Sequence, residues 1–184
     1  MKRHPTISAQ TIALTGLLAA VSLVFLFLAG VIPSGWAGVT AVAGLAVAVA
    51  VASAGYLSGV LCWLVSGLLG LLLLPAKHVA VLFFCLFGLY PVLKCLFERV
   101  PIRGLEYELK LAFFNLVFFG LYALAFPLLF QSFAADWHFP VPFLPSAALG
   151  GNLIFLAYDY AFSKVMALLQ ARLVPQLRRR FAGR

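Results

Sequence analysis

Long apolar stretches dominate the chain, and turn residues or short polar segments separate them. Each stretch approaches the roughly 20 residues that a helix needs to cross a bilayer. Val and Ala alternate at 45–52 as in a strand, but a lone strand would leave its backbone unsatisfied in lipid, so helix is favoured there too. The pattern predicts an all-α integral membrane protein, a bundle of six transmembrane helices. The predicted spans are 9–32, 37–54, 56–74, 79–96, 111–130 and 147–170.

Prolines and glycines mark the turns between these spans. Pro33 and Pro75 open two of the predicted loops, and Gly55 permits a tight turn between the second and third spans. Pro91 falls near the end of the fourth span, where we expect it to kink or end the helix because proline lacks an N–H.

Composition leaves little room for anything besides the membrane helices. Of the 184 residues 65% are apolar and 10% are charged, whereas about 25% are charged in a typical soluble domain. We therefore expect one membrane domain, 1–184, that ends in a basic cytoplasmic tail, 171–184. Neither a phosphate-binding loop nor a paired Cys or His motif for a metal is present. The chain is expected to be no enzyme and to need neither cofactor nor metal.

The net charge of +8 follows the predicted topology. With six spans and both termini in the cytoplasm, twelve of the thirteen basic residues fall on the inner face and only Lys77 on the outer one. An excess of Lys and Arg in short inner loops is the usual signal of orientation. The charge thus predicts a multi-pass protein with cytoplasmic termini, and we expect no nucleic-acid partner. The inner residues are Lys2, Arg3, Lys94, Arg99, Arg103, Lys110, Lys164, Arg172, Arg178, Arg179, Arg180 and Arg184.

Small residues at a spacing of three or four residues occur in the first three spans, and this spacing lets membrane helices approach closely. In the second and third spans, exemplified by Gly44 and Gly59, packing inside the molecule is favoured. In the first span the small residues lie in the cytoplasmic half, where either internal packing or docking of a partner subunit would use them. These four residues are Ala9, Ala13, Gly16 and Ala20.

The segment 13–22, the Ala9-x-x-x-Ala13 pair, the turn at Pro33 and the small-residue second span resemble the S-components of energy-coupling-factor (ECF) transporters. Segments 75–78 and 87–94, with Phe114-Asn115, resemble an uncharacterised branch of these substrate-capture subunits. The resemblance implies a solute-binding protein of a bacterial cytoplasmic membrane. It also implies that the first-span small residues couple it to a transmembrane subunit and two ATP-binding subunits.

A set of polar and aromatic residues on the predicted outer side could bind the solute. Lys77 carries the only outward positive charge and could pair with a carboxylate or phosphate. Tryptophans at this depth also serve as interface anchors, so both interpretations stay open for them. A small anionic or polar-aromatic solute fits best. The candidate binding residues are Trp36, Lys77, His78, Trp137, His138 and Asn152.

Three polar residues fall inside predicted spans, where they are costly and often functional. Asp159 lies about 12 residues into the sixth span, past the bilayer midplane toward the cytoplasm, and Lys94 of the fourth span is its expected partner. A structural ion pair is favoured over a role in proton or subunit coupling. Asn115 is expected to form a hydrogen bond between helices.

The C-terminal tail has apolar residues on one helical face beside Arg178, Arg179 and Arg180. A basic amphipathic segment of this kind binds anionic lipid at the membrane surface; the alternative is a solvated tail. For the whole protein, the alternative to a transport subunit is a structural membrane protein, similar to the rod-shape scaffold subunits, that binds no solute.

Overall fold

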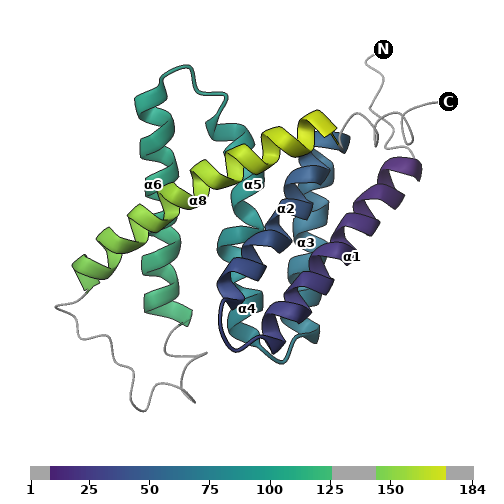
Figure 1. Ribbon diagram of the computed structural model, residues 1–184, viewed down its shortest axis with the longest axis horizontal. Coiled ribbons are helices and arrows are strands. Elements are labelled where there is room, and N and C mark those ends of the chain that lie inside the picture. The colour runs from purple at the N-terminus through teal and green to yellow at the C-terminus, as the bar shows by residue number, and fades with distance from the viewer. Residues whose placement is uncertain (1–8, 126–143, 173–184) are drawn as a thin grey trace. The chain divides into compact units, whose positions relative to one another are not determined.

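The computed structural model describes residues 9–125 and 144–172, and every regular element within them is a helix (Figure 1). Five helical segments are long and apolar enough to cross a membrane, in agreement with an all-α multi-pass membrane protein. Helix α6 (Arg103–Gly120) covers the first half of the predicted fifth span, 111–130, and is not among these five segments. The count of six spans and the cytoplasmic termini stay predictions. The five segments are Ala9–Val31, Trp36–Ala54, Tyr56–Leu73, Lys77–Phe97 and Pro145–Arg172.

The chain divides into two compact units, although the sequence predicts one membrane domain. Of the described residues, 9–95 and 165–172 belong to the first, which we call the N-terminal unit. Residues 96–125 and 144–164 form the second, which we call the α6–α8 unit.

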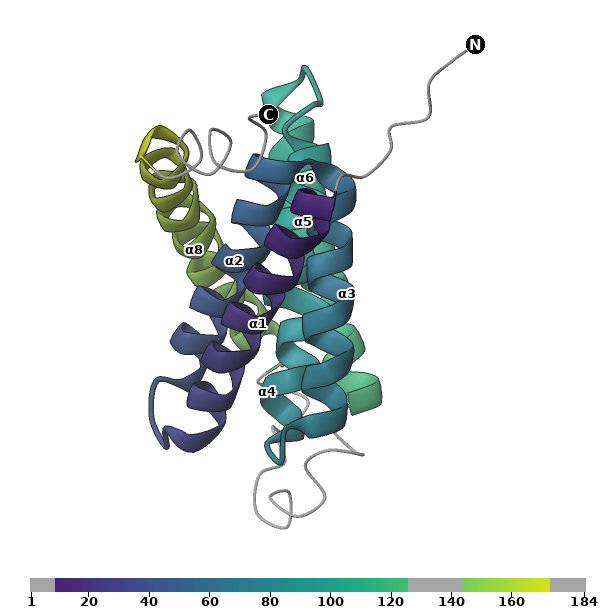
Figure 2. The same cartoon turned by 90° about the vertical axis from the view of Figure 1, so that its right-hand side faces the viewer.

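Four successive apolar segments build the N-terminal unit, and their ends lie within two residues of the predicted spans. Figure 2 shows α1 beside α2 and α3. The single residue Gly55 joins α2 to α3 at a φ of 97°, a conformation that glycine adopts without strain. The helices are α1 (Ala9–Val31), α2 (Trp36–Ala54), α3 (Tyr56–Leu73), α4 (Lys77–Leu82), the π-helical turn η1 (Phe83–Phe87) and α5 (Leu89–Phe97).

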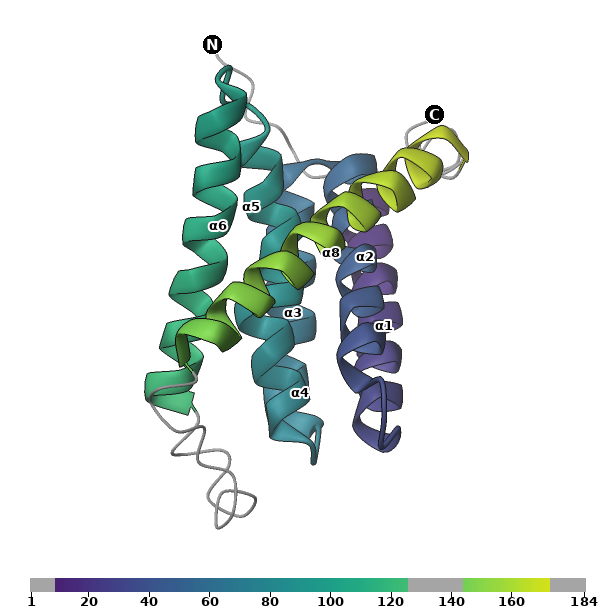
Figure 3. The same ribbon diagram turned by 60° about the vertical axis from the view of Figure 1, so that its left-hand side comes forward.

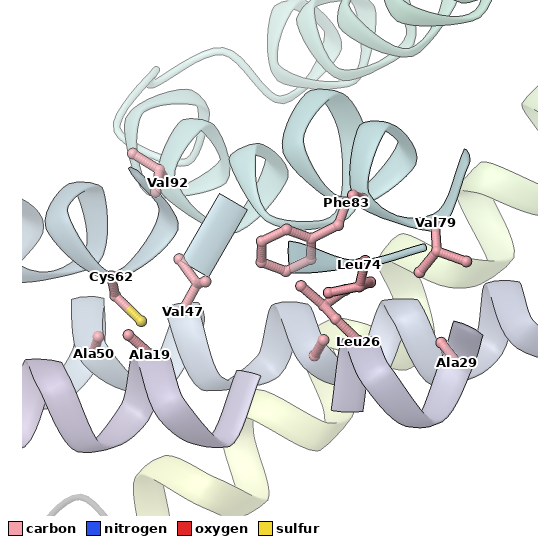
Figure 4. Close-up of a cluster of buried hydrophobic side chains, with 12 residues drawn as sticks. Ala19, Leu26, Ala29, Val47, Ala50, Cys62, Leu74, Val79, Phe83 and Val92 are labelled. Atoms are coloured by element: carbon pink, nitrogen blue, oxygen red, sulfur yellow. The ribbon is translucent and has the colours of Figure 1, made fainter. Parts of the chain in front are cut away.

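The core of this unit contains side chains from all of these segments (Figure 4). Leu26 of α1, Val47 of α2 and Phe83 of η1 are fully buried. Leu74, which follows α3, and Val79 of α4 belong to the same cluster and flank the turn between these two helices. Burial of each large apolar side chain in a close-packed interior gains dispersion contacts that lipid supplies less completely.

Glycines let the helices of this unit come close together. A Cβ on Gly44 would collide with the backbone carbonyl of Phe87, and one on Gly59 with the side chain of Val51. Both glycines are buried. The predicted internal packing of the second and third spans is therefore confirmed at these positions.

The fourth span continues past Pro91, which is the third residue of α5, and ends only at Phe97. The helix is distorted before the proline instead, in the π-helical turn η1. Because Pro91 has no N–H, it donates nothing to the carbonyl of Phe87, and that carbonyl lies against Gly44. Of the two predicted outcomes at Pro91, an end of the helix is thus not observed, and the distortion of the span lies in the preceding turn η1.

The α6–α8 unit contains α6, the π-helical turn η2 (Leu121–Ala125) and most of α8 (Leu144–Arg172) (Figure 3). Helix α6 begins eight residues before the predicted span at 111. Ile102, Leu105 and Leu109 have helical spacing after Pro101, and the structure joins this segment to the apolar one in a single helix. Four of its first eight residues are charged, so an estimate based on apolar length alone places the start too late.

Candidate functional site

Two of the predicted solute-binding residues meet at one end of the N-terminal unit. Trp36 is the first residue of α2 and His78 is the second residue of α4. Their rings contact edge to face, with centroids 5.0 Å apart and an interplanar angle of 86°. Both side chains are half-buried. The turns after α1 and α3 thus bring together an indole and an imidazole that are far apart in the sequence.

The neighbouring Lys77 contacts the end of helix α3. Its Nζ donates hydrogen bonds to the carbonyl oxygens of Leu71, at 2.7 Å, and Leu72, at 3.3 Å. These carbonyls belong to the last turn of α3, where the helix dipole favours a positive charge. An ammonium has three N–H donors, and these two bonds use two of them. Lys77 therefore caps the end of α3, a role that the sequence does not predict.

Trp137 and His138 lie outside the described residues, as does the basic tail from residue 173. The remaining candidate, Asn152, is in α8, within the α6–α8 unit. Among the described residues, the predicted solute-binding residues are thus divided between the two units. Trp36, Lys77 and His78 lie at one end of the N-terminal unit, and Asn152 lies in an interhelical contact of the α6–α8 unit.

Asn152 and Asn115 form a reciprocal pair between α8 and α6. The amide of Asn115 donates to Oδ1 of Asn152 at 3.0 Å, and the amide of Asn152 donates to Oδ1 of Asn115 at 3.1 Å. Each amide also donates to the carbonyl four residues before it, Leu111 or Ala148, at 2.8 Å. The predicted interhelical bond of Asn115 is confirmed. Asn152 is its partner, so both amides are engaged within the protein.

Lys110 joins the same two helices through an ion pair. Its Nζ lies 3.2 Å from Oδ2 of Asp159 and 2.6 Å from Oε1 of Glu106, and its side chain is only 3% exposed. The sequence does not predict this partner of Asp159, because Lys110 comes just before the apolar run of the predicted fifth span. The four-residue spacing of Glu106 and Lys110 indicates that both lie on one face of a helix, and this was the signal that the sequence offered.

Lys94, the partner that the sequence predicts for Asp159, is buried in α5 of the N-terminal unit. Its ammonium lies 5.7 Å from the centroid of the Tyr90 ring, within the range of a cation–π contact. The pairing of Lys94 with Asp159 stays a prediction.

Aromatic rings fill the contact between α6 and α8. Phe114 and Phe155 stack with centroids 4.8 Å apart and an interplanar angle of 21°. On both helices the phenylalanine falls, in sequence, between the asparagine and the ion-paired residue. We call this set the α6–α8 seam: Lys110–Asp159, Phe114–Phe155 and Asn115–Asn152.

The small residues of α1 lie on the surface of the N-terminal unit. All four, Ala9, Ala13, Gly16 and Ala20, are exposed, and a Cβ on Gly16 would meet nothing within 4 Å. The packing of this unit uses another face of the helix. The buried residues of α1 are Leu14, Thr15, Ala19, Ser22, Leu26 and Ala29.

Within residues 9–125 and 144–172, no three His, Cys, Asp or Glu residues gather in a way that could hold a metal ion. The end of the N-terminal unit offers an indole, an imidazole and an ammonium, and α1 offers a surface of small side chains. The chain matches no family model, no curated protein and no solved structure.

Proposed function

We propose that this protein is the solute-binding membrane subunit of an ECF-type importer, located in a bacterial cytoplasmic membrane. In this proposal six spans place both termini in the cytoplasm. A transmembrane coupling subunit and two ATP-binding subunits supply the energy.

The exposed small-residue face of α1 is the observation that carries the proposal. Small side chains permit close approach of another helix, which van der Waals packing then stabilises in lipid. The second and third spans use their small residues inside the unit, at Gly44 and Gly59. Ala13 and Gly16 stay on the surface, as a docking face for a transmembrane partner requires.

The solute in this proposal is small and either anionic or polar-aromatic. It would bind near Trp36 and His78, whose rings supply apolar area and a polar edge. Lys77 supports an anionic solute through its remaining N–H donor.

A scaffold protein that binds no solute is the second candidate, and two observations favour it. Lys77 caps α3, and Asn152 is paired with Asn115. Lys77 and Asn152 therefore both have structural roles. A scaffold would need such roles, and a solute site would not.

Co-purification from native membranes, with mass spectrometry of the recovered subunits, tests the proposal. Tagged wild-type protein should recover two ATP-binding subunits and one transmembrane subunit. Ala13→Trp should reduce their recovery at least tenfold, because the indole prevents the close approach of helices. The variant itself should fold, since Ala13 is exposed.

Val21→Trp is the matched control. Val21 is also exposed on α1, at 39%, but lies outside the spacing of the small residues. It should leave the recovery unchanged. Wild-type protein that recovers no ATP-binding subunit would contradict the transport proposal and favour the scaffold.

A further inference from the structure

The fourth span contains a turn of π-helix in the middle of an otherwise α-helical segment. In η1 the N–H of Gly88 donates to the carbonyl of Phe83, five residues earlier, at 2.7 Å. A π turn holds one more residue than the α turn it replaces, is rare, and often marks a functional position. It divides the span into α4, which carries His78, and α5, which carries Lys94.

A side chain from another helix holds this turn. The indole Nε1–H of Trp63, in α3, donates to the carbonyl oxygen of Phe84 at 2.9 Å. The Trp63 ring also stacks on the Phe84 ring, with centroids 4.9 Å apart and an interplanar angle of 27°. A wide turn disturbs the regular i to i+4 bonding of backbone carbonyls, and a donor from outside the helix compensates for it.

Two further glycines make space for this arrangement. A Cβ on Gly67 of α3 would collide with the ring of Phe84 at 2.5 Å. A Cβ on Gly88 would lie 2.8 Å from ring atoms of both Phe83 and Trp63. Glycine is the only residue that fits at either position without a shift of rigid rings, so the local packing is built around the π turn.

We propose that Trp63 is the latch of a hinge in the fourth span. While its indole N–H bonds to the carbonyl of Phe84, the π turn persists. When that bond opens, the turn relaxes toward α-helix, which is the more favourable geometry for an isolated segment. Because the turn then holds one residue fewer, α4 and α5 rotate relative to each other about the axis of the span. The hinge thus connects the end that carries His78 with the end that carries Lys94.

Cys85 lies within the turn and is a natural reporter of its opening. It is half-buried, whereas Cys62 is fully buried in the core of the same unit. The test is the rate at which N-ethylmaleimide modifies each cysteine of the full-length protein in detergent micelles. Trp63→Phe keeps an aromatic ring against Phe84 but removes the N–H donor. It should speed the modification of Cys85 about tenfold, equivalent to about 1.4 kcal/mol, and leave Cys62 protected.

Phe84→Leu is the matched variant, because it removes the ring stack and keeps the carbonyl that Trp63 bonds. It should change the Cys85 rate less than Trp63→Phe does. Equal Cys85 rates in wild type and Trp63→Phe would overturn the proposal. So would exposure of Cys62 together with Cys85, because the whole unit would then have loosened.

Hydrogen exchange of the backbone gives a second measurement. In Trp63→Phe the peptide that contains Gly88 should exchange about tenfold faster, while peptides of α1 keep the wild-type rate. Unchanged exchange at Gly88 would contradict the latch even if the cysteine rates differ.

Discussion

The two compact units are stabilised by different kinds of contact. In the N-terminal unit the helices approach through glycine, and Gly44 lies against a backbone carbonyl of the fourth span. In the α6–α8 unit the helices are joined by side chains that cross between them: the Lys110–Asp159 ion pair, the Asn115–Asn152 amide pair and the Phe114–Phe155 stack.

Because the contacts differ, the two kinds of interface should respond differently to substitution. A glycine contact depends on the absence of a side chain, so any added atom disturbs it, whatever its polarity. A polar contact depends on two partners, so loss of one leaves the other buried without compensation. The first interface should thus be sensitive to volume and the second to charge and hydrogen bonding.

The largest effect is expected from Lys110→Met. It leaves the carboxylates of Asp159 and Glu106 without the buried ammonium, and breaking a buried ion pair in this way costs about 3–5 kcal/mol. Hydrogen exchange of α6 peptides in micelles measures the loss of stability. Lys164→Met should be nearly neutral, because Lys164 is exposed. The double variant Lys110→Met with Asp159→Leu should recover most of the loss; if it is no more stable than the single variant, charge is not what this interface depends on.

Next is Gly44→Ala, which tests the sensitivity of the N-terminal unit to volume. The added methyl group collides with the carbonyl of Phe87, and overpacking of this kind costs about 1–3 kcal/mol. The fluorescence of Trp36 and Trp63 during denaturation in mixed micelles reports the change. Gly38→Ala is the matched control in the same helix, since a Cβ there meets nothing within 4 Å. If both variants gain stability equally, helix propensity and not close approach governs this interface, because alanine favours a helix more than glycine does.

The smallest effect is expected from Asn115→Leu. Hydrogen bonds between membrane helices contribute about 0.6 kcal/mol on average, although the amides of Asn115 and Asn152 exchange two. A double-mutant cycle with Asn152→Leu isolates their coupling, again by hydrogen exchange of α6 peptides. A coupling energy of zero would show that, of the two polar pairs in the α6–α8 seam, only Lys110–Asp159 contributes to stability.

How far the sequence predicts the molecule varies with the element. The first three spans have bounds within one residue of their prediction because apolar length and glycine or proline turns are local signals. The start of α6 is missed because four of its first eight residues are charged, whereas a membrane span is recognised from its apolar length. The interhelical bond of Asn115 is predictable because this polar residue lies within an apolar run of the sequence. The identity of its partner is not predictable in this way.

Three features follow from the sequence: the all-helical membrane class, the positions of most helices and the spacing of small residues in the first span. Each of these follows from hydrophobicity and spacing along a single segment. Three contacts are visible only in the folded protein: Lys110 pairs with Asp159, Lys77 caps α3, and Trp63 donates to the carbonyl of Phe84. These contacts join separate segments of the chain, and their partners are selected by the packing of helices, which no local pattern encodes.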